Sequence, residues 1–349
     1  MAVLIVTPGF AANEQDDTCI PPLQLLVQEL SGRGYKVLVV PLEYPFSRVP
    51  YSFYGAKVFP CNGRNQKWRR WYTHYWASKR IRHLIEQHTV KIIFSFWLTQ
   101  AWSLVNKLAL PLPHYTVLMG QDVLRQKNRR YLKQLHPENA IRLIAVSAFQ
   151  AAQLQQQTGI TPAHIIPWGV ENTPVIQTHR PVDILGAGAL IPVKNWNLWL
   201  ECVAETVRQR PETRAVLIGG GPLAAHLQRY AHELGIASNV QFTGHIERKN
   251  VLEWMDQSKI LLHTSRYESF GYVLAEAHAR QCAVISTPTG IAQECGWTAE
   301  DRDGLAEHIK DVLEDAPDKG LRPFTLLAQH TTDQYVALIE REISRNPLL

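Results

Sequence analysis

Three features are missing from this sequence of 349 residues, and each absence excludes a class of protein. No run of about 18 apolar residues occurs, so the sequence predicts no transmembrane helix. The N-terminal segment MAVLIVTPGF has no basic residues before its apolar run, so it is typical of a first strand rather than of a signal peptide. The five cysteines are scattered without metal-ligand spacing, which predicts reduced thiols in a cytoplasmic protein.

Acidic residues are scarce in the first half of the chain. Residues 1–175 carry 19 Lys and Arg against 9 Asp and Glu, whereas the remainder carries 17 against 22. This excess of positive charge predicts an anionic partner for the first half, such as a phospholipid surface or a phosphorylated acceptor. The alternative is a surface that only solubilises the protein.

The segment 57–83 concentrates this basic character, because it contains eight Lys and Arg and no Asp or Glu. Five aromatic residues recur there at the spacing of one helical face: Trp68, Trp71, Tyr72, Tyr75 and Trp76. A basic helix with an aromatic stripe is suited to an anionic membrane surface, which would place the protein peripherally on the inner face of the membrane. The alternative is that the aromatic side chains pack on a sheet while the charges face water. Nucleic-acid binding is a third use of such a helix, and the nucleotide-binding motifs described below argue against it.

Apolar runs of strand length alternate with helical patterns along the whole chain. Runs that are apolar throughout are typical of a parallel sheet with helices on both faces. One series of elements precedes the polar segment Glu171–Pro181, which contains two prolines and is the predicted linker, and a second series follows it. The sequence therefore predicts two doubly wound α/β domains, 1–172 and 173–330, and a C-terminal helix at 331–349 that packs back toward the first domain. The default binding site is the cleft between the domains, at the carboxyl ends of the strands.

The stretch SRYESFGYVLAE, residues 265–276, is the most informative one. It follows an apolar run and leads into a helical pattern, so we expect a helix to start near Phe270. The backbone N–H groups of Ser269, Phe270 and Gly271 would then form a seat for a phosphate. Glu268 precedes this seat and Glu276 lies about 9 Å beyond the helix start, at 1.5 Å per residue. Two carboxylates on either side of an anion seat fit a ligand with hydroxyl groups at both ends, such as a nucleotide sugar.

Three further motifs lie earlier in the second half. Lys194 ends a strand–loop–helix junction, where its charge can contact a pyrophosphate. The run Gly219-Gly220-Gly221 follows a predicted strand and permits close approach of the backbone to a ligand. Gly244, His245 and Ile246 follow the next predicted strand, and His245 is expected at the rim of the site rather than in catalysis.

The order of these motifs is GALIPVKNWNLWL, VLIGGGPL, VQFTGHI and SRYESFGYVLAEAHARQCAVISTPTG. Residues 185–295 thereby resemble the nucleotide-binding domain of the family-4 retaining glycosyltransferases, whose GT-B fold has two Rossmann-like domains facing each other across a cleft. The resemblance implies transfer of a sugar from a nucleoside diphosphate to a glycan, lipid or small-molecule acceptor. It further implies retention of anomeric configuration, and no metal ion or other cofactor. It assigns Glu268 to the sugar, Glu276 to the ribose, Lys194 to the diphosphate and Gly244–Ile246 to the base.

The first half of the chain resembles the family more loosely. Gly120-Gln121-Asp122 is similar to the acceptor-side motif, so Asp122 could hold an acceptor hydroxyl or steady the cleft. Gly9, after the first strand, is similar to the glycine loop that lies near the donor phosphates. Two positions depart from the family pattern: Ala189 replaces an Arg that would share the diphosphate charge, and Met119 stands where a His is often found.

The segment Asp301-Arg302-Asp303 spells DxD, the metal-binding motif of a different glycosyltransferase fold. It lies beyond the nucleotide-binding region at the start of a predicted helix, where acidic residues are favoured, so we expect no metal site there. Two alternatives to a transferase remain open. One is an epimerase or phosphorylase of the same fold, and the other is a non-catalytic nucleotide-sugar binder, which Ala189 and Met119 favour.

Overall fold

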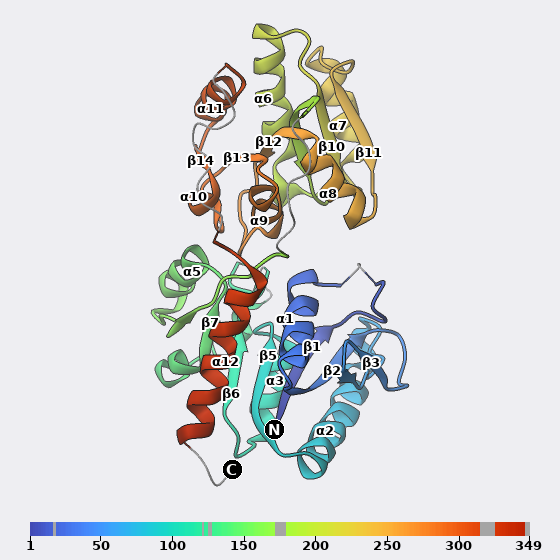
Figure 1. Cartoon of the computed structure of the whole chain (residues 1–349), viewed down its shortest axis with the longest axis vertical. Helices are drawn as coiled ribbons and strands as arrows, with labels where there is room; N and C mark the ends of the chain where they lie inside the picture. Colours follow the sequence, from blue (N-terminus) through green and yellow to red (C-terminus); the bar gives the residue numbers. More distant parts are fainter. Residues whose placement is uncertain (17–18, 121, 125–127, 172–178, 315–324, 346–349) are drawn as a thin grey trace. The chain divides into compact units, whose positions relative to one another are not determined.

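The chain forms two compact units in a computed structural model that describes residues 1–16, 19–120, 122–124, 128–171, 179–314 and 325–345. Unit 1 comprises Met1–Gly169 together with Leu327–Leu349, and unit 2 comprises Val170–Leu326 (Figure 1). The predicted boundary at 173 falls close to this division, although residues 172–178 of the predicted linker lie outside the described part of the chain.

Unit 1 is built on a sheet whose described strands run in the order β3-β4-β2-β1-β5-β6-β7-β8. Neighbouring strands are parallel except for β3 and β4, which pair antiparallel. The central strand β1 is buried from Ala2 to Thr7, which explains why its sequence is an apolar run without alternation. The strands are β1 (Ala2–Gly9), β2 (Lys36–Tyr44), β3 (Tyr51–Phe53), β4 (Ala56–Val58), β5 (Val90–Phe96), β6 (His114–Val117), β7 (Leu143–Ala145) and β8 (His164–Ile165).

Helices connect these parallel strands and cover the sheet of unit 1. The described ones are α1 (Pro21–Gly32), η1 (Lys67–Arg69), α2 (Arg70–Gln87), α3 (Gln100–Leu108), α4 (Arg129–Leu132), η3 (Pro137–Arg142), α5 (Ala148–Thr158) and α12 (Ala328–Arg345). Ser147 caps α5, because its side chain accepts a hydrogen bond from the Gln150 N–H.

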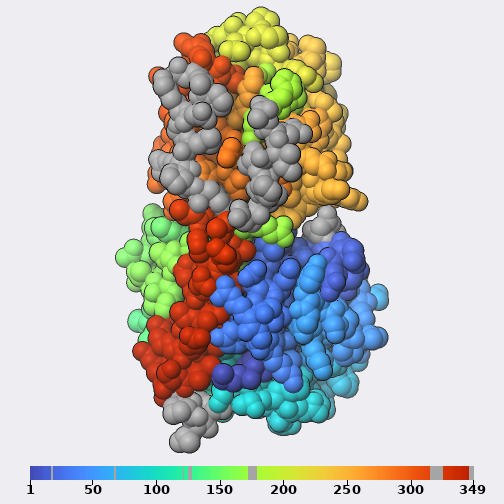
Figure 2. Space-filling model, viewed as in Figure 1, coloured from blue at the N-terminus to red at the C-terminus, as the bar shows by residue number. Residues whose placement is uncertain are grey.

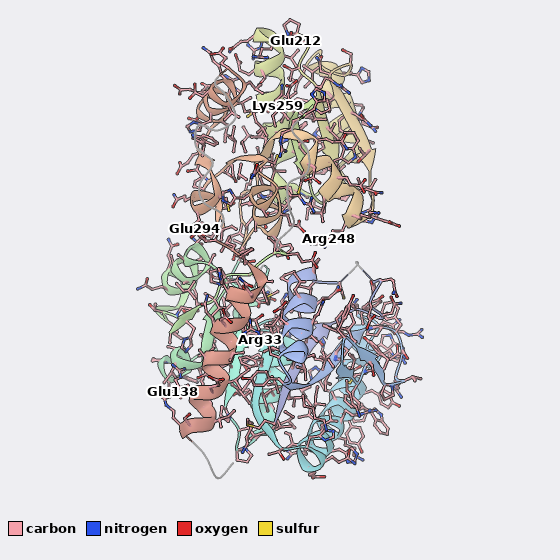
Figure 3. The ribbon with its side chains drawn as sticks, in the orientation of Figure 1. Arg33, Glu138, Glu212, Arg248, Lys259 and Glu294 are labelled. Atoms are coloured by element: carbon pink, nitrogen blue, oxygen red, sulfur yellow. The ribbon has the colours of Figure 1, made fainter. Side chains whose placement is uncertain are left out.

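The last helix, α12, returns to unit 1 and packs beside α1, as the red and blue surfaces in Figure 2 show. Arg33 at the end of α1 forms an ion pair with Asp333 of α12, Nη1 to Oδ1 2.6 Å (Arg33 is labelled in Figure 3). On the sheet side, the hydroxyl of Tyr115 donates to Glu342, 2.8 Å away, and Glu342 is buried. The helix begins at Ala328, slightly before the predicted residue 331.

Helix α2 shows whether the aromatic residues of segment 57–83 are exposed or packed on the sheet. Its buried residues are Thr73, Ala77, Ile81 and Leu84, so these small and aliphatic side chains face the sheet. The aromatic residues point outward instead, with Trp68 79% and Trp71 77% exposed. The alternative in which the aromatic stripe packs on a sheet is therefore wrong. We call the exposed group Trp68, Trp71, Tyr72, Tyr75 and Trp76 the aromatic surface.

Unit 2 contains a second sheet, with described strands in the order β11-β10-β9-β12-β13-β14 and all neighbours parallel. Its strands are β9 (Val182–Ala187), β10 (Ala215–Ile218), β11 (Val240–Gly244), β12 (Ser258–His263), β13 (Ala283–Ser286) and β14 (Trp297–Thr298). Its described helices are η4 (Pro192–Lys194), α6 (Trp196–Gln209), α7 (Ala224–Glu233), α8 (Arg248–Asp256), α9 (Tyr272–Ala279), α10 (Ala292–Cys295) and α11 (Arg302–Glu314). Trp196 and Trp199 of α6 are fully buried in the core of this unit.

Candidate functional site

The strand order of unit 2 brings two predicted site residues together. Strand β9 lies between β10 and β12, so the chain leaves β9 toward one side of the sheet and later returns on the other side. In doubly wound sheets, ligands bind beyond the carboxyl ends of the strands at such a switch point. Lys194 follows β9 and Glu268 follows β12, so both lie at this position.

Lys194, Glu268 and His263 form one cluster at the switch point. The Lys194 Nζ lies 2.5 Å from Glu268 Oε1, and His263 Nε2 lies 3.0 Å from the same oxygen. His263, the last residue of β12, is fully buried, while the side chains of Lys194 and Glu268 are 18% and 16% exposed. The carboxylate of Glu268 is thus fixed from two sides and still reaches the surface of unit 2.

The charges of this cluster follow from its burial and its contacts. Burial raises the pKa of Glu268, but the hydrogen bond from His263 and the charge of Lys194 outweigh it and hold that pKa well below its usual range. Burial lowers the pKa of His263, so its imidazole is neutral near pH 7 and donates the Nε2 hydrogen to the carboxylate. Glu268 is therefore a permanent anion that can accept hydrogen bonds from hydroxyl groups.

Backbone contacts between the two loops hold Lys194 in place. The Thr264 hydroxyl donates to the carbonyl oxygens of Lys194 and Asn195, both at 3.1 Å. The Arg266 N–H donates to the Val193 carbonyl at 2.9 Å. These bonds tie the loop after β12 to the turn that carries Lys194, so the cation and the carboxylate are positioned by one rigid pair of loops.

The helix that follows this loop starts within two residues of the predicted position. Helix α9 begins at Tyr272, and its N-cap is Gly271, which has a left-handed backbone with φ 84°. Of the three residues predicted to seat a phosphate, Gly271 lies at the helix start, whereas Ser269 and Phe270 lie in the loop before it. A Cβ built on Gly271 would lie 3.6 Å from the Glu268 Cγ, so Glu268 lies directly beside the helix start.

Glu276 lies further along α9, buried and already paired. Its Oε1 accepts a hydrogen bond from Arg248 Nε at 2.8 Å, and Arg248 is the first residue of α8 (labelled in Figure 3). Burial raises the pKa of Glu276 although Arg248 opposes the shift. The two carboxylates of the stretch therefore differ: Glu268 has a lowered pKa and Glu276 a raised one.

The glycine-rich motifs lie where the loops after β9, β10 and β11 meet. The Gly219 N–H donates to the Gly244 carbonyl at 2.9 Å, and the Leu190 N–H donates to the Gly220 carbonyl at 2.9 Å. Gly219 has φ 147°, and a Cβ there would lie 1.8 Å from the Gly188 carbonyl oxygen, so only glycine fits. Gly221 lies in the same loop, beside Leu190. His245 and Ile246 follow β11 directly; His245 is exposed and Ile246 is half-buried.

Asp122 lies in unit 1 at the carboxyl end of β6, where it links two loops. Its Oδ2 accepts hydrogen bonds from the backbone N–H groups of Leu98, at 2.7 Å, and Met119, at 2.9 Å. The residue is buried, and burial raises the pKa of its carboxyl group to about 7. Asp122 thus holds the loops after β5 and β6 together, while Gln121 of the same motif lies outside the described residues.

Two other features of unit 1 belong to the same edge of its sheet. Trp97, directly after β5, has a left-handed backbone with φ 72°, which is unusual for a bulky residue and is typical of functional loops. Gly9 ends β1, and its carbonyl accepts a hydrogen bond from the Thr7 hydroxyl at 3.0 Å. The following residue, Phe10, is buried and packs edge-on against Phe53.

Sequence reasoning missed three of these residues. His263 was treated only as part of an apolar run, although a histidine at the carboxyl end of a central parallel strand lies where ligands bind in such sheets and so indicates a site residue. Arg248 could have been noticed as a cation placed just after the Gly244 motif. Trp97 could not be predicted as a site residue, because the residue type of a non-glycine position does not indicate a left-handed backbone.

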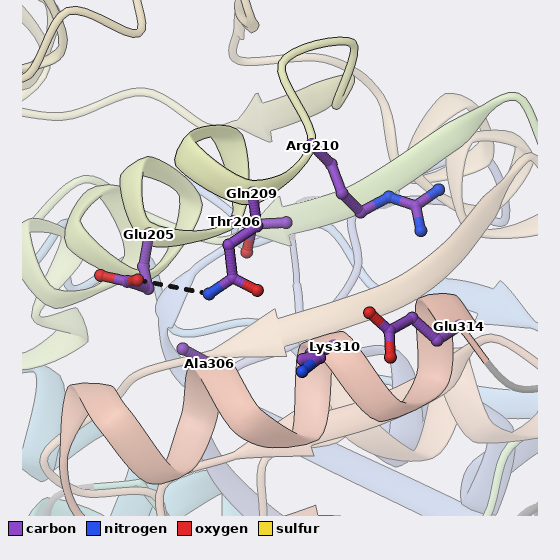
Figure 4. A pocket seen from close by; sticks show the side chains of 7 residues that line it. All are labelled: Glu205, Thr206, Gln209, Arg210, Ala306, Lys310 and Glu314. Atoms are coloured by element: carbon purple, nitrogen blue, oxygen red, sulfur yellow. Dashed lines mark hydrogen bonds between the residues drawn. The ribbon is translucent and has the colours of Figure 1, made fainter.

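Other candidate sites are weaker. Within the described residues no group of His, Cys, Asp or Glu side chains is arranged to hold a metal ion. The described DxD segment caps a helix, because Asp301 Oδ1 accepts a hydrogen bond from the Gly304 N–H at 2.9 Å. A shallow groove between α6 and α11 is lined by Glu205, Arg210, Lys310 and Glu314 among others, and by no residue of the cluster (Figure 4). No helix in the described part of the chain is long and apolar enough to cross a membrane.

Comparison with known families accounts for both units. The sequence profile described as Glycosyltransferase Family 4 matches residues 23–173, and the one described as Glycosyl transferases group 1 matches residues 174–321. The chain belongs to the family-4 glycosyltransferases. Its fold is accordingly the GT-B fold, in agreement with the prediction.

Individual members of the family are distant from this chain. The D-inositol 3-phosphate glycosyltransferase 2 of Catenulispora acidiphila is 28% identical over 300 residues, which cover 77% of this chain and 61% of that protein. The Vi polysaccharide biosynthesis protein VipC/TviE of Salmonella typhi is 37% identical over 102 residues, 29% of this chain and 17% of that protein. This chain thus spans between a sixth and three fifths of the length of these two relatives.

Solved structures of similar shape support the fold. A glycosyltransferase from Rickettsia africae superposes with a TM-score of 0.73 at 16% identity, covering 98% of each chain. The Anabaena protein Alr3699/HepE, solved in complex with UDP and glucose, superposes with a TM-score of 0.65 at 17% identity, covering 99% of each chain.

Proposed function

We propose that this family member transfers a sugar from a nucleoside diphosphate to a hydroxyl group of an acceptor, with retention of anomeric configuration and without a metal ion. The observation that carries the proposal is the Lys194–Glu268–His263 cluster beside the start of α9. It combines a cation, an anion and a helix N-terminus at the switch point of the sheet, which is what a negatively charged leaving group and a hydroxyl-rich sugar require.

Each residue has a role in this reaction. The bond between the sugar C1 and the diphosphate oxygen breaks, and the charge that develops on that oxygen is stabilised by Lys194 and the N-terminus of α9. The acceptor oxygen forms the new bond to C1, and its proton leaves with the diphosphate. Glu268 accepts hydrogen bonds from the sugar hydroxyls and Glu276 from the ribose. Asp122 keeps the loops after β5 and β6 in position on the acceptor side.

A product assay tests the transfer. The full chain is incubated with each common nucleoside-diphosphate sugar, a panel of lipid and glycan acceptors, and EDTA. We expect free nucleoside diphosphate and a glycosylated acceptor in equal amounts. An epimerised donor or a sugar phosphate would instead identify an epimerase or phosphorylase, and donor binding without turnover would identify a non-catalytic binder.

Site variants then connect this activity to the cluster. Glu268→Gln and Lys194→Met should each lower the rate by on the order of 100-fold. Glu314→Gln and Lys310→Met, two exposed residues of α11 in the groove of Figure 4, are matched controls and should leave the rate unchanged. Full activity in both cluster variants would refute the assignment.

We also propose that unit 1 binds an anionic membrane surface through the aromatic surface, which lies on η1 and α2. Trp68 and Trp71 are the two most exposed aromatic side chains among those described. Cations lie over two rings of the aromatic surface, Arg69 over Trp68 at 5.5 Å and Lys79 over Tyr75 at 4.8 Å. Aromatic rings flanked by basic groups fit the interface of a bilayer with anionic headgroups, where rings insert and cations contact phosphates.

Vesicle flotation tests this second proposal. At low salt we expect binding to vesicles with about a third anionic phospholipid, and weaker binding as salt screens the charges. The double variant Trp68→Ser/Trp71→Ser should lose binding, whereas Ile141→Ser, at a residue 53% exposed elsewhere in unit 1, should keep it. Absence of binding by the unmodified chain at low salt would refute membrane association.

A further inference from the structure

Arg248 connects the two helices that frame the predicted ribose position. It is the first residue of α8, and its guanidinium reaches α9, where Nε donates to Glu276 Oε1 at 2.8 Å. It also forms a hydrogen bond with the side chain of Tyr272, the first residue of α9. Tyr272 and Glu276 are four residues apart and therefore lie on one face of that helix. One guanidinium thus links both residues of this face.

The environment of Glu276 makes this contact important. Its side chain is only 10% exposed, and a carboxylate in such a place loses most of its hydration. The groups that face it are Arg248 of α8, Tyr272 of α9, Arg280 directly after α9, and Glu171. Arg248 is the cation in direct contact, so it opposes protonation of the carboxyl group most strongly. A guanidinium is planar and always charged, so it fixes the orientation of its partner as well as its charge.

We propose that Arg248 is a positioning residue for the donor nucleotide: it holds Glu276 ionised and oriented, so that the site binds ribonucleotides in preference to deoxyribonucleotides. Arg248 contacts Oε1, and Oε2 is the oxygen that we assign to the ribose hydroxyl. The inference rests on the proposed function, because it takes Glu276 as the ribose-binding residue.

Comparing the affinities for nucleoside diphosphates and for their deoxy forms distinguishes a positioning role of Arg248 from a merely structural one. The probe is whichever of UDP, GDP and ADP the unmodified chain binds in calorimetry, compared with its 2′-deoxy and 3′-deoxy forms. A hydrogen bond to a charged group contributes a factor of about 10 to 100 in affinity, so we expect a ribo-to-deoxy preference of that size for at least one hydroxyl. In Arg248→Met the preference should fall to about twofold.

Three variants complete the experiment. Arg248→Lys should recover part of the preference, because it restores the charge without the planar geometry. Arg229→Met, at an exposed residue of α7, is the matched control and should keep the full preference. Glu276→Gln should lose the preference while Arg248 is intact. Thermal unfolding of each variant verifies that it is folded.

The outcomes separate the inference from the function on which it rests. If the unmodified chain binds ribo and deoxy forms equally, the assignment of Glu276 to the ribose fails. If it discriminates and Arg248→Met discriminates equally well, the ribose assignment stands and the role of Arg248 is refuted. If Arg248→Met binds both forms more weakly by the same factor, Arg248 contacts the phosphates or base directly, which also refutes the positioning role.

Discussion

Lys194 and Glu268 form a direct ion pair, Nζ to Oε1 2.5 Å, between the loops that follow the neighbouring strands β9 and β12. The two residues are 74 positions apart in sequence, and both are mostly buried. Each is therefore the main charged partner of the other, and each has a separate predicted role toward the donor. Structural and catalytic contributions can be separated because the pair can be removed one residue at a time or as a unit.

The first prediction concerns this pair. Lys194→Met leaves a buried carboxylate without its cation and should lower the free energy of unfolding by about 2–3 kcal/mol, as should Glu268→Gln to a smaller extent. The double variant removes both charges and should regain most of that stability without regaining activity. Urea unfolding and the transfer assay, run on the three variants, measure the two effects. Recovery of activity along with stability would mean that the pair is structural only.

The second prediction concerns His263, whose hydrogen bond helps to keep Glu268 ionised. The folded-state pKa of Glu268 is lowered, so the stability it contributes is present above its unfolded pKa and is lost only as pH falls through the lower folded value. The unmodified chain should therefore lose no activity through Glu268 between pH 7 and about pH 5. In His263→Phe the pKa of Glu268 should rise and an acid limb should enter the pH–rate profile. An unchanged profile in this variant would contradict the role of His263.

The third prediction concerns Asp122, whose pKa is raised by burial to about 7. Between its unfolded pKa near 4 and this value the folded chain binds more protons than the unfolded chain, so stability should fall as pH rises through that window, by at most about 4 kcal/mol. Asp122→Asn should remove this pH dependence and retain transfer within about threefold, because an amide oxygen still accepts the two backbone bonds. Unfolding at pH 5 and pH 8 measures the slope.

Asp122→Ala, in contrast to Asp122→Asn, removes the hydrogen-bond acceptor at this position. Asp122→Ala leaves the N–H groups of Leu98 and Met119 without their acceptor and should lower the free energy of unfolding by about 2–4 kcal/mol. If Asp122→Asn abolished transfer while keeping stability, the carboxylate itself would act on the acceptor, contrary to the positioning role.

The fourth prediction concerns Ala189, an exposed residue where the family pattern has an Arg. Ala189→Arg should add a second cation near the diphosphate and raise the affinity for a nucleoside diphosphate about three- to tenfold. Ala225→Arg, at an exposed residue of α7, adds the same charge elsewhere in unit 2 and should have little effect. Calorimetry at two salt concentrations compares them. Equal gains for both variants would show a general effect of charge rather than a diphosphate contact.

The sequence was sufficient for the fold because its strands are apolar throughout. Strands such as β1 and β12 are buried on both faces, so their composition alone indicates a covered parallel sheet. The buried face of helix α2 could not be predicted in the same way, because aromatic residues at helical spacing form the same sequence pattern whether they face a sheet or water. The start of α9 was predicted to within two residues, and its exact position depends on the left-handed backbone of Gly271.

The candidate site was only partly predictable. Glu268, Glu276 and Lys194 could be named because they lie in recognisable motifs, whereas their contacts could not. The pair of Arg248 and Glu276 joins residues 28 positions apart on two helices, and no local pattern relates them. The hydrogen bond from His263 depends on a side-chain orientation at the end of β12. Contacts of this kind follow from packing, which periodicity and motif order do not encode.

We propose above that the cluster at the switch point of unit 2 carries out retaining sugar transfer. Proton NMR of the reaction between a nucleoside-diphosphate sugar and an accepted acceptor tests it most directly, because the coupling constant of the anomeric proton reports configuration as the product forms. The product should keep the anomeric configuration of the donor, and Glu268→Gln should form it about 100-fold more slowly than the unmodified chain. A product of inverted configuration, or an equal rate in Glu268→Gln, would contradict it.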